Sequence, residues 1–433
     1  MAADLATLNA VLKNNYTIGY ITEELNQAVD AWLDFEDTTL PVVGGLCILP
    51  LHTSRNAGVG AAGDGAPTPI AGQQGYKNLQ ITPKYVYGVA QITGPALAAA
   101  ANSQGSFAIE FKAEMDGLVT DMRKKMSKYT FTGGNGIGFV WQRQNGPFTW
   151  EYSGRPDIAT DPDYGVAVGV GQTVSFVRLS DYAIIGAGTQ VNSITNDTLT
   201  LAGVIDTTGG TLADAYLVVH NGNAFVNGQV QALSLEPTGF AGTFGLQSLF
   251  GLDRSLATNA RLRCIFRKAD PTTSAKASLT TDGMAMVIAR IAQESGKRPT
   301  KMWMSWIQQV AYQSLMVNVV VGGVGTSKSP NLRRDIHDKA GHADPGDLTF
   351  GYAGVPIKPS DVCPGGSIYF TLNDSWTRVN LGGKDGHWVD QGGSPMVKVQ
   401  NADAYQATYA LYYEQVCRAP NQNGLITGIE VPA

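Results

Sequence analysis

The chain has 433 residues, of which 43% are hydrophobic and 15% are charged, enough for two or three domains with a sizeable core. Its 51 glycines favour turn-rich β structure and extended loops over an all-helical protein. The net charge of −5 argues against a broadly basic surface for nucleic acid.

The cysteines and the N-terminus exclude further classes. Cys47, Cys264, Cys363 and Cys417 lie far apart and form no C-x-x-C pair, so we predict buried free thiols rather than a zinc ribbon or a disulfide framework. The N-terminus lacks a basic region followed by an apolar core, and no run approaches about 18 apolar residues. We therefore expect a soluble protein without a membrane segment, made in a cytoplasm.

The first 40 residues are predicted to form an arm of two short amphipathic helices. Residues 1–14 place Leu5, Leu8 and Leu12 on one side, and Thr22 is a favourable N-cap for the second helix. Two such short helices are too small to stabilise each other alone, so we expect the arm to dock on something larger.

Residues 40–54 predict an apolar strand, after which regular patterning disappears. The stretch 54–75 is rich in glycine and alanine and has two prolines. A structureless stretch of about 20 residues is uncommon inside a compact domain and is usually functional or disordered. Because it has so little apolar surface of its own, we expect a neighbouring molecule to hold it if it is ordered.

Residues 76–93 predict one strand, with Ile81, Tyr85, Tyr87 and Val89 on one face. A long helix is predicted over 106–132, and Gly133 and Gly134 would end it. Acidic residues lie in its first half and basic residues in its last turns, so these charges would compensate the helix dipole. An apolar ridge runs along it at spacings of three and four. Its members are Phe107, Phe111, Met115, Leu118, Met122 and Met126. Both a long strut and an ordinary core-packed helix fit this pattern.

Short alternating strands separated by turn clusters characterise residues 137–263, for example 173–179, 198–204 and 215–220. They predict a small antiparallel barrel or sandwich. The region contains no lysine and several aspartates, so it is acidic. The alternative is that these strands belong to one large mixed sheet.

The helical period returns at residue 279. Thr280 or Thr281 is the predicted cap of a helix that stops at Gly296, and Ser305 opens a second helix over 305–316 through a capping box. We predict a strand over 316–321 and a loop over 322–335. From residue 348 onwards strands dominate again, over 349–360, 367–374, 377–381, 395–400, 405–419 and 424–429.

This order of elements resembles the major capsid proteins of tailed bacteriophages, which have the HK97-type fold. The resemblance is carried most specifically by residues 82–119 and by the C-terminal third, and it covers the whole chain in order of elements. It implies an α+β fold in which an N-terminal arm is followed by an extended hairpin (the E-loop), a spine helix, and peripheral (P) and axial (A) domains, here with a small β domain inserted after the spine. The implied parts are 1–40 (arm), 41–93 (E-loop and first P-domain strand), 94–134 (spine region), 135–265 (inserted β domain), 266–347 (A-domain) and 348–433 (remaining A- and P-domain strands).

The resemblance also implies which residues meet a neighbouring copy. On the hairpin tip they are Arg55, Asn56, Gly58, Gly60, Gly63, Asp64, Gly65 and Gly72. Charges that could face the lumen, packaged DNA or an interface are Arg123, Lys124, Lys125, Lys128, Arg333 and Arg334, although a solvated charged face is the better explanation for them. Some relatives cross-link through an E-loop lysine, but the segment 54–75 has none, so this chemistry is not carried over.

No motif predicts catalysis, a cofactor or a metal. The segment 337–347 holds His337, Asp338, His342, Asp344 and Asp347. Its His-x4-His spacing fits neither H-E-x-x-H nor a zinc finger, so a polar surface loop is the better interpretation. The segment 322–329 lacks the Gly-Lys of a phosphate loop. We therefore expect a protein that is not an enzyme.

The resulting hypothesis is a head protein that self-assembles into pentamers and hexamers of an icosahedral shell around double-stranded DNA, which it contacts weakly and without sequence preference. Separate scaffolding, portal and decoration proteins are expected partners. The expected location is the virion, after assembly in the bacterial cytoplasm. The alternatives are an encapsulin-type shell and, in another class, a β-rich glycan-binding protein or hydrolase.

Overall fold

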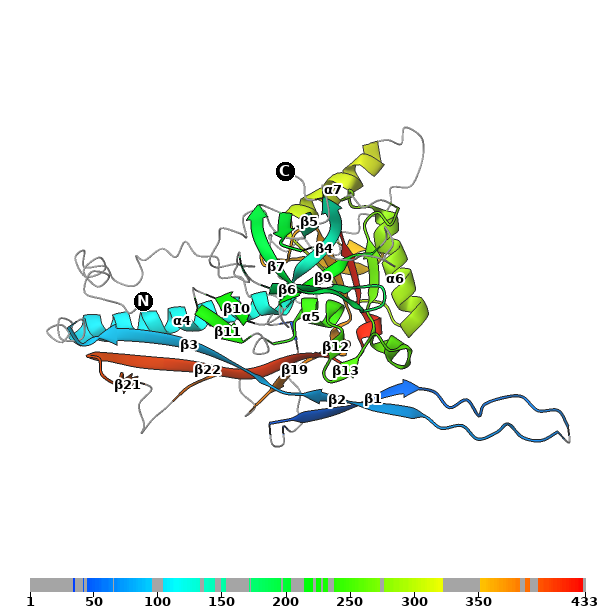
Figure 1. Cartoon of the computed structure of the whole chain (residues 1–433), viewed down its shortest axis with the longest axis horizontal. Coiled ribbons are helices and arrows are strands. Elements are labelled where there is room, and N and C mark those ends of the chain that lie inside the picture. The colour runs from blue at the N-terminus through cyan, green and yellow to red at the C-terminus, as the bar shows by residue number, and fades with distance from the viewer. Residues whose placement is uncertain are drawn as a thin grey trace, which may run out of the picture.

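The computed structural model describes residues 34–35, 42, 45–64, 66–95, 104–132, 136–144, 149–152, 171, 173–195, 198–203, 214–220, 223–226, 229–232, 237–272, 276–321, 351–381, 386–389 and 396–430. They form a mixed α+β fold with three visible parts (Figure 1). A long antiparallel sheet carries a helix along one face, a globular body lies at one end of that sheet, and a β-hairpin extends past the body.

The long sheet is organised around β22 (Ala404–Cys417). This strand pairs antiparallel with β3 (Lys84–Thr93) over ten residue pairs, and with β19 (Trp376–Asn380), β20 (His387–Trp388) and β21 (Met396–Lys398). The predicted strand over 76–93 is therefore wrong in one respect, because it is interrupted at Thr82 and Pro83. Proline cannot donate to a sheet ladder, and the chain changes partners at this point.

Helix α4 (Gln104–Thr132) covers one face of this sheet and ends directly before Gly133, as predicted. Met122 and Met126 are buried with Leu411 and Tyr413, and a Cβ on Gly88 of β3 would come within 2.9 Å of Met122. Met115 and Leu118 are half-buried, while the side chains of Phe107 and Phe111 lie outside the described residues. The predicted dipole compensation is wrong, because the first turn of the helix carries no acidic residue and its last turn carries no basic residue.

The globular body contains a six-stranded sheet in the order β14-β23-β18-β15-β17-β16. Its strands are β14 (Ile265–Lys268), β23 (Gly424–Thr427), β18 (Ser367–Thr371), β15 (Lys301–Met304), β17 (Val355–Pro359) and β16 (Gly351–Tyr352). Helix α6 (Thr281–Ser295) packs its buried face on this sheet. Thr280 caps it by accepting a hydrogen bond from Gly283 N, and Gly296 ends it with φ +72°, both as predicted.

Helix α7 (Trp306–Val321) is longer than predicted, because it continues through residues 316–321, where a strand was expected. The β-branched valines there favour a strand locally, but their helix propensity is only slightly lower than that of good helix formers, so context decides. Ser305 Oγ accepts a hydrogen bond from Gln308 N, which is the predicted capping contact.

Six antiparallel strands form a closed barrel in the order β4-β5-β8-β7-β6-β9, in the region where the sequence predicts short alternating strands. They are β4 (Gly136–Gln144), β5 (Thr149–Tyr152), β6 (Thr173–Arg178), β7 (Ile184–Thr195), β8 (Thr198–Leu201) and β9 (Tyr216–His220). Strands β10 (Asn223–Val226) and β11 (Gln229–Ala232) form a separate hairpin.

The segment after these strands packs into the main core. It contains α5 (Phe240–Gly245), the small hairpin β12 (Ser248–Leu249) and β13 (Leu252–Asp253), and the 3₁₀ helix η4 (Ala257–Leu262). Phe240 lies within 4.9–5.3 Å, centroid to centroid, of the rings of Phe131, Tyr369 and Trp376. Two further 3₁₀ turns, η5 (Asn373–Ser375) and η6 (Pro420–Gln422), flank β19 and β23.

Phe35 of the N-terminal arm is buried in this same core, 5.6 Å from the ring of Trp376, and Asp34 forms an ion pair with Lys301. Residues 34 and 35 are thus attached to the body. The remaining residues of the two predicted arm helices lie outside the described part of the chain. All four cysteines are buried free thiols, as predicted. Of the helices described, none has the length and apolar character needed to cross a membrane.

Candidate assembly interface

The hairpin of β1 (Cys47–Ser54) and β2 (Gly75–Ile81) has a firmly packed root. Cys47, Leu49, Leu79 and Ile81 are buried together, against Val379 and Val416 of the long sheet. Gln80 N donates to Phe250 O at 3.1 Å, and Lys77 Nζ donates to Thr258 O at 3.2 Å and to Asn259 Oδ1. Because the root is fixed on two sides, the direction of the hairpin is set by the body.

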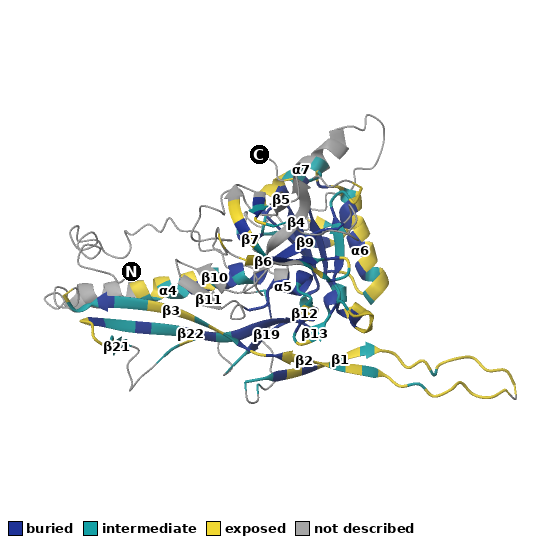
Figure 2. Cartoon of the chain, viewed as in Figure 1, coloured by how far each residue is buried: buried dark blue, intermediate teal, exposed yellow. Residues whose placement is uncertain are grey.

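Beyond the root, residues 55–64 and 66–74 continue as two extended arms, which Figure 2 shows as an exposed projection. The arms touch at their glycines. A Cβ on Gly58 would lie 2.6 Å from Gly72 N and 2.7 Å from Ile70 O, and a Cβ on Gly72 would lie 2.7 Å from Gly58 N. Asn56 Oδ1 accepts a hydrogen bond from Gly58 N at 2.7 Å, and Ala66 N donates to Gly63 O at 3.0 Å near the end of the tip. Glycine at these positions therefore lets one arm approach the other.

The predicted tip residues fall into two groups. Asn56, Gly58 and Gly72 are brought together, whereas Arg55, Gly60, Gly63 and Asp64 are exposed and spread along the arms. Within the described part of the chain, neither Arg55 nor Asp64 forms an ion pair. Gly65 lies outside the described residues.

Two apolar side chains on the tip were missed from the sequence. Val59 is 87% exposed and Ile70 is 91% exposed. Isolated apolar residues in a glycine-rich stretch give no periodic signal, so only the extended conformation reveals them. Since the body does not cover them, the tip presents two apolar side chains and two charges to solvent.

A second exposed surface lies on the face of the long sheet opposite α4. Tyr85, Tyr87 and Val89 of β3 are each about half exposed. The Tyr412 ring lies next to them, with centroid distances of 5.3 Å to Tyr85 and 5.9 Å to Tyr87. Tyr85, Tyr87 and Val89 share one face of β3, as predicted, and in a single chain this face is open. Ile81, predicted on the same face, belongs instead to β2 and is buried in the hairpin root.

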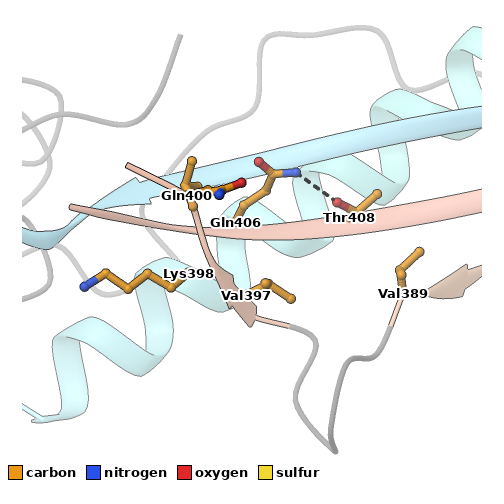
Figure 3. Close-up of a pocket in the computed structure, with 7 residues that line it drawn as sticks. Val389, Val397, Lys398, Gln400, Gln406 and Thr408 are labelled. Atoms are coloured by element: carbon orange, nitrogen blue, oxygen red, sulfur yellow. Dashed lines mark hydrogen bonds between the residues drawn. The ribbon is translucent and has the colours of Figure 1, made fainter. Parts of the chain in front are cut away.

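The same face contains a hollow of about 250 Å³ between β20, β21 and β22, shown in Figure 3. Val389 and Val397 flank it, and the Gln406 side chain donates a hydrogen bond to Thr408 Oγ1 at 3.2 Å across its floor. Among the described residues that line the hollow, Lys398 is the only titratable one.

The predicted charges of α4 are not equivalent. Arg123 is exposed, Lys124 and Lys125 are half-buried, and Lys125 Nζ lies 5.4 Å from the centre of the Tyr129 ring. Lys128 is only 4% exposed, so it does not belong to the accessible charges as predicted. Its position beside Met126 and Ser127 on the packed end of the helix accounts for this. Arg333 and Arg334 lie outside the described residues.

Several ionisable groups of the described residues are buried. Burial raises the pKa of the Glu414 carboxyl to about 8, and Glu414 Oε1 accepts hydrogen bonds from Gln415 N at 3.0 Å and from Thr238 N. Burial also raises the pKa of the Cys264 and Cys363 thiols. No group of His, Cys, Asp and Glu able to hold a metal occurs among the residues described, and the segment 337–347 lies outside them.

Comparison by sequence gives no match: no protein-family model fits the chain, and no curated protein is similar to it. Comparison by structure does. A chain of the cyanophage A-1(L) capsid aligns with a TM-score of 0.52 and 10% identity, over 99% of this chain and 98% of that one. Two further structures align more weakly. The SrpI encapsulin complex of Synechococcus elongatus has a TM-score of 0.45 and 9% identity, over 100% of this chain and 98% of that one. The capsid of a native GTA particle has a TM-score of 0.47 and 9% identity, over 99% of each chain. The predicted resemblance is confirmed for the fold: this chain has the fold of a phage capsid protein.

Proposed function

We propose that this chain is the major capsid protein of a tailed phage, and that it assembles with copies of itself into an icosahedral shell that encloses double-stranded DNA. The observation that carries the proposal is the hairpin 46–81, whose root is packed on the body and whose tip is exposed over almost its whole length. In this interpretation the hairpin is the E-loop, α4 is the spine helix, and the β3–β22 sheet belongs to the P-domain. The six-stranded sheet with α6 and α7 is the A-domain, and the closed barrel is the inserted domain.

The exposed tip is energetically costly for a protein that works alone. Each residue that is held extended loses conformational entropy worth about 1–2 kcal/mol, and a two-stranded ribbon in water is marginally stable at best. Val59 and Ile70 gain nothing from burial in their own chain. The tip becomes useful when a sister copy covers it, because both the backbone and these two side chains are then removed from water.

A contact in which the tip of one copy meets a different surface of the next copy is heterologous. Such contacts close into rings when the rotation between copies allows it, which yields the proposed pentamers and hexamers. A persistent contact buries roughly 1,000 Å² or more in total. A tip of about 20 residues supplies only part of this area, so further contacts through the open face of the long sheet and through the body belong to the proposal.

The charge of the chain fits a container better than a DNA-binding enzyme. A net charge of −5 keeps attraction for packaged DNA weak and sequence-independent, since every phosphate neutralised by a basic residue strengthens binding. The proposed location is the virion, after assembly in the host cytoplasm. Separate scaffolding, portal and decoration proteins are the expected partners, and no catalytic role is assigned to the chain.

Electron microscopy of the protein expressed alone, and with the genes that neighbour its own, tests the proposal. We expect closed icosahedral particles of uniform size, and DNA inside particles isolated from an infection. Particles that contain an enzyme instead of DNA would identify an encapsulin-type compartment. A monodisperse monomer under all conditions would contradict a shell function.

A further inference from the structure

A groove of about 600 Å³ lies on the body, and no residue of the hairpin lines it. One wall is β14, the edge strand of the six-stranded sheet, and another is the outer face of α6. Leu179 and Ser180, directly after β6, and Asp214, before β9, complete it. Elements from three separate parts of the chain therefore meet at one concave surface.

The lining of this groove is strongly cationic. It contains Arg263, Arg267, Lys268 and Arg290 but only two acidic residues, Asp214 and Glu294. In a chain whose overall charge is negative, this is a local excess of two positive charges. Positive charge is thus concentrated in this groove, although the net charge of the chain is negative.

The three guanidinium groups lack carboxylate partners within the described part of the chain. Arg263 donates to the backbone oxygens of Arg254 and Ser255, both at 2.8 Å, which fixes its position but leaves its charge unneutralised. The Nε of Arg267 is buried and has no hydrogen-bond partner among the described residues. Arg290 lies on the exposed face of α6, one turn before Glu294. A buried donor without an acceptor costs about 1–3 kcal/mol, so the groove is incomplete as it stands.

The chemistry that would complete it is an anion with several acceptor oxygens. Guanidinium groups present planar pairs of N–H donors that match phosphate and carboxylate oxygens. One carboxylate carries a single charge, which would leave an excess of positive charge in the groove. A chain of phosphoryl groups carries at least one charge per phosphorus and can reach several arginines at once, within the volume available.

We propose that this groove is a binding site for oligophosphate anions, held by Arg263, Arg267 and Arg290. The phosphoryl groups come either from a free oligophosphate or from the backbone of a nucleic acid. The site is independent of the hairpin, so it stands whether or not the shell function is correct.

Titration of the intact protein with inorganic triphosphate, followed by isothermal calorimetry at low ionic strength, tests this inference. We expect saturable binding of one triphosphate per chain and a higher melting temperature in its presence. The double variant Arg267→Gln/Arg290→Gln should lose affinity by about tenfold or more, because two charged donor groups are removed. Its fold should be retained, since Arg267 Nε has no hydrogen bond to lose.

A matched control removes the same charge elsewhere. Arg298 and Arg418 are exposed and do not line the groove, so Arg298→Gln/Arg418→Gln should bind triphosphate as the unaltered chain does. Competition by a short duplex DNA would identify nucleic acid as a source of the phosphates, whereas triphosphate binding without such competition would identify a free oligophosphate. Absence of saturable binding, or an equal loss in both double variants, would overturn the proposal.

Discussion

Glu414 makes the stability of this protein depend on pH in a way that can be measured. The residue lies in β22 with 1% of its surface exposed, and burial raises its pKa from the ordinary 4.5 to about 8. The hydrogen bonds that Oε1 accepts from Thr238 N and Gln415 N, and the nearby charge of Lys84, lower the pKa but do not offset the burial. At neutral pH the folded protein therefore holds this carboxyl protonated.

The sign follows from proton binding. Between pH 4.5 and about 8 the folded state keeps a proton on Glu414 that the unfolded chain releases, so the free energy of unfolding decreases as the pH rises. The contribution is complete below 4.5 and lost by the time the pH passes 8. At about 1.4 kcal/mol per pH unit, raising the pH from 5 to 8 removes about 4 kcal/mol.

Glu414→Gln tests this directly, because the amide keeps the shape of the protonated carboxyl and an oxygen that can accept both hydrogen bonds, but it does not titrate. We expect the free energy of unfolding in urea, measured at several values between pH 5 and 8, to decrease more steeply for the unaltered chain, by about 1.4 kcal/mol per unit. Taking the difference between the two proteins removes the contribution of every other group. Parallel pH dependences would refute the burial argument.

Three further substitutions test other contacts. Gly72→Ala places a Cβ 2.7 Å from Gly58 N and should separate the hairpin arms, so we expect impaired assembly in sedimentation analysis and an unchanged melting temperature of the subunit. The matched variant Gly63→Ala, whose added Cβ has its nearest neighbour 4.0 Å away, should assemble normally, and equal behaviour of the two variants would argue against the arm contact. Arg254→Lys removes most of the donors that the fully buried guanidinium offers to the carbonyl oxygens of α5 and nearby residues, and it should lower the free energy of unfolding by about 3 kcal/mol. The surface variant Arg261→Lys should lower it by less than about 0.5 kcal/mol, and similar losses in both variants would show that the buried hydrogen bonds contribute little. Phe35→Ala empties a space between Phe240 and Trp376 and should cost about 3–5 kcal/mol in chemical denaturation, whereas a loss below about 1 kcal/mol would mean that the arm is not held by this residue.

The sequence predicts those features whose signals are local. Thr280 and Gly296 bound α6 because a cap and a positive-φ glycine act within one turn, and the α4 ridge follows from a repeat of three and four residues. The alternation of short strands over 173–220 likewise predicts barrel-like structure. These signals depend only on neighbouring residues, so no knowledge of the tertiary structure is needed to interpret them.

The features that were missed depend on distant parts of the chain. The break at Pro83 matters because β2 and β3 find different partners, β1 and β22, and the second of these lies more than 300 residues away. Val59 and Ile70 appear unremarkable until the tip is seen to be uncovered. The cationic groove draws Asp214, Arg267 and Arg290 from three elements. Lys128 was assigned to the surface because its charge suggests exposure, but the packing of α4 on the sheet decides otherwise.

The central claim, that one copy uses its hairpin tip to hold another, is tested most directly by deleting residues 56–74. Sedimentation velocity of the deletion variant and of the intact chain, under identical conditions, gives the answer. We predict shells for the intact chain, and folded subunits with an unchanged circular dichroism spectrum that do not assemble for the variant. Shells of normal size from the deletion variant would contradict this account.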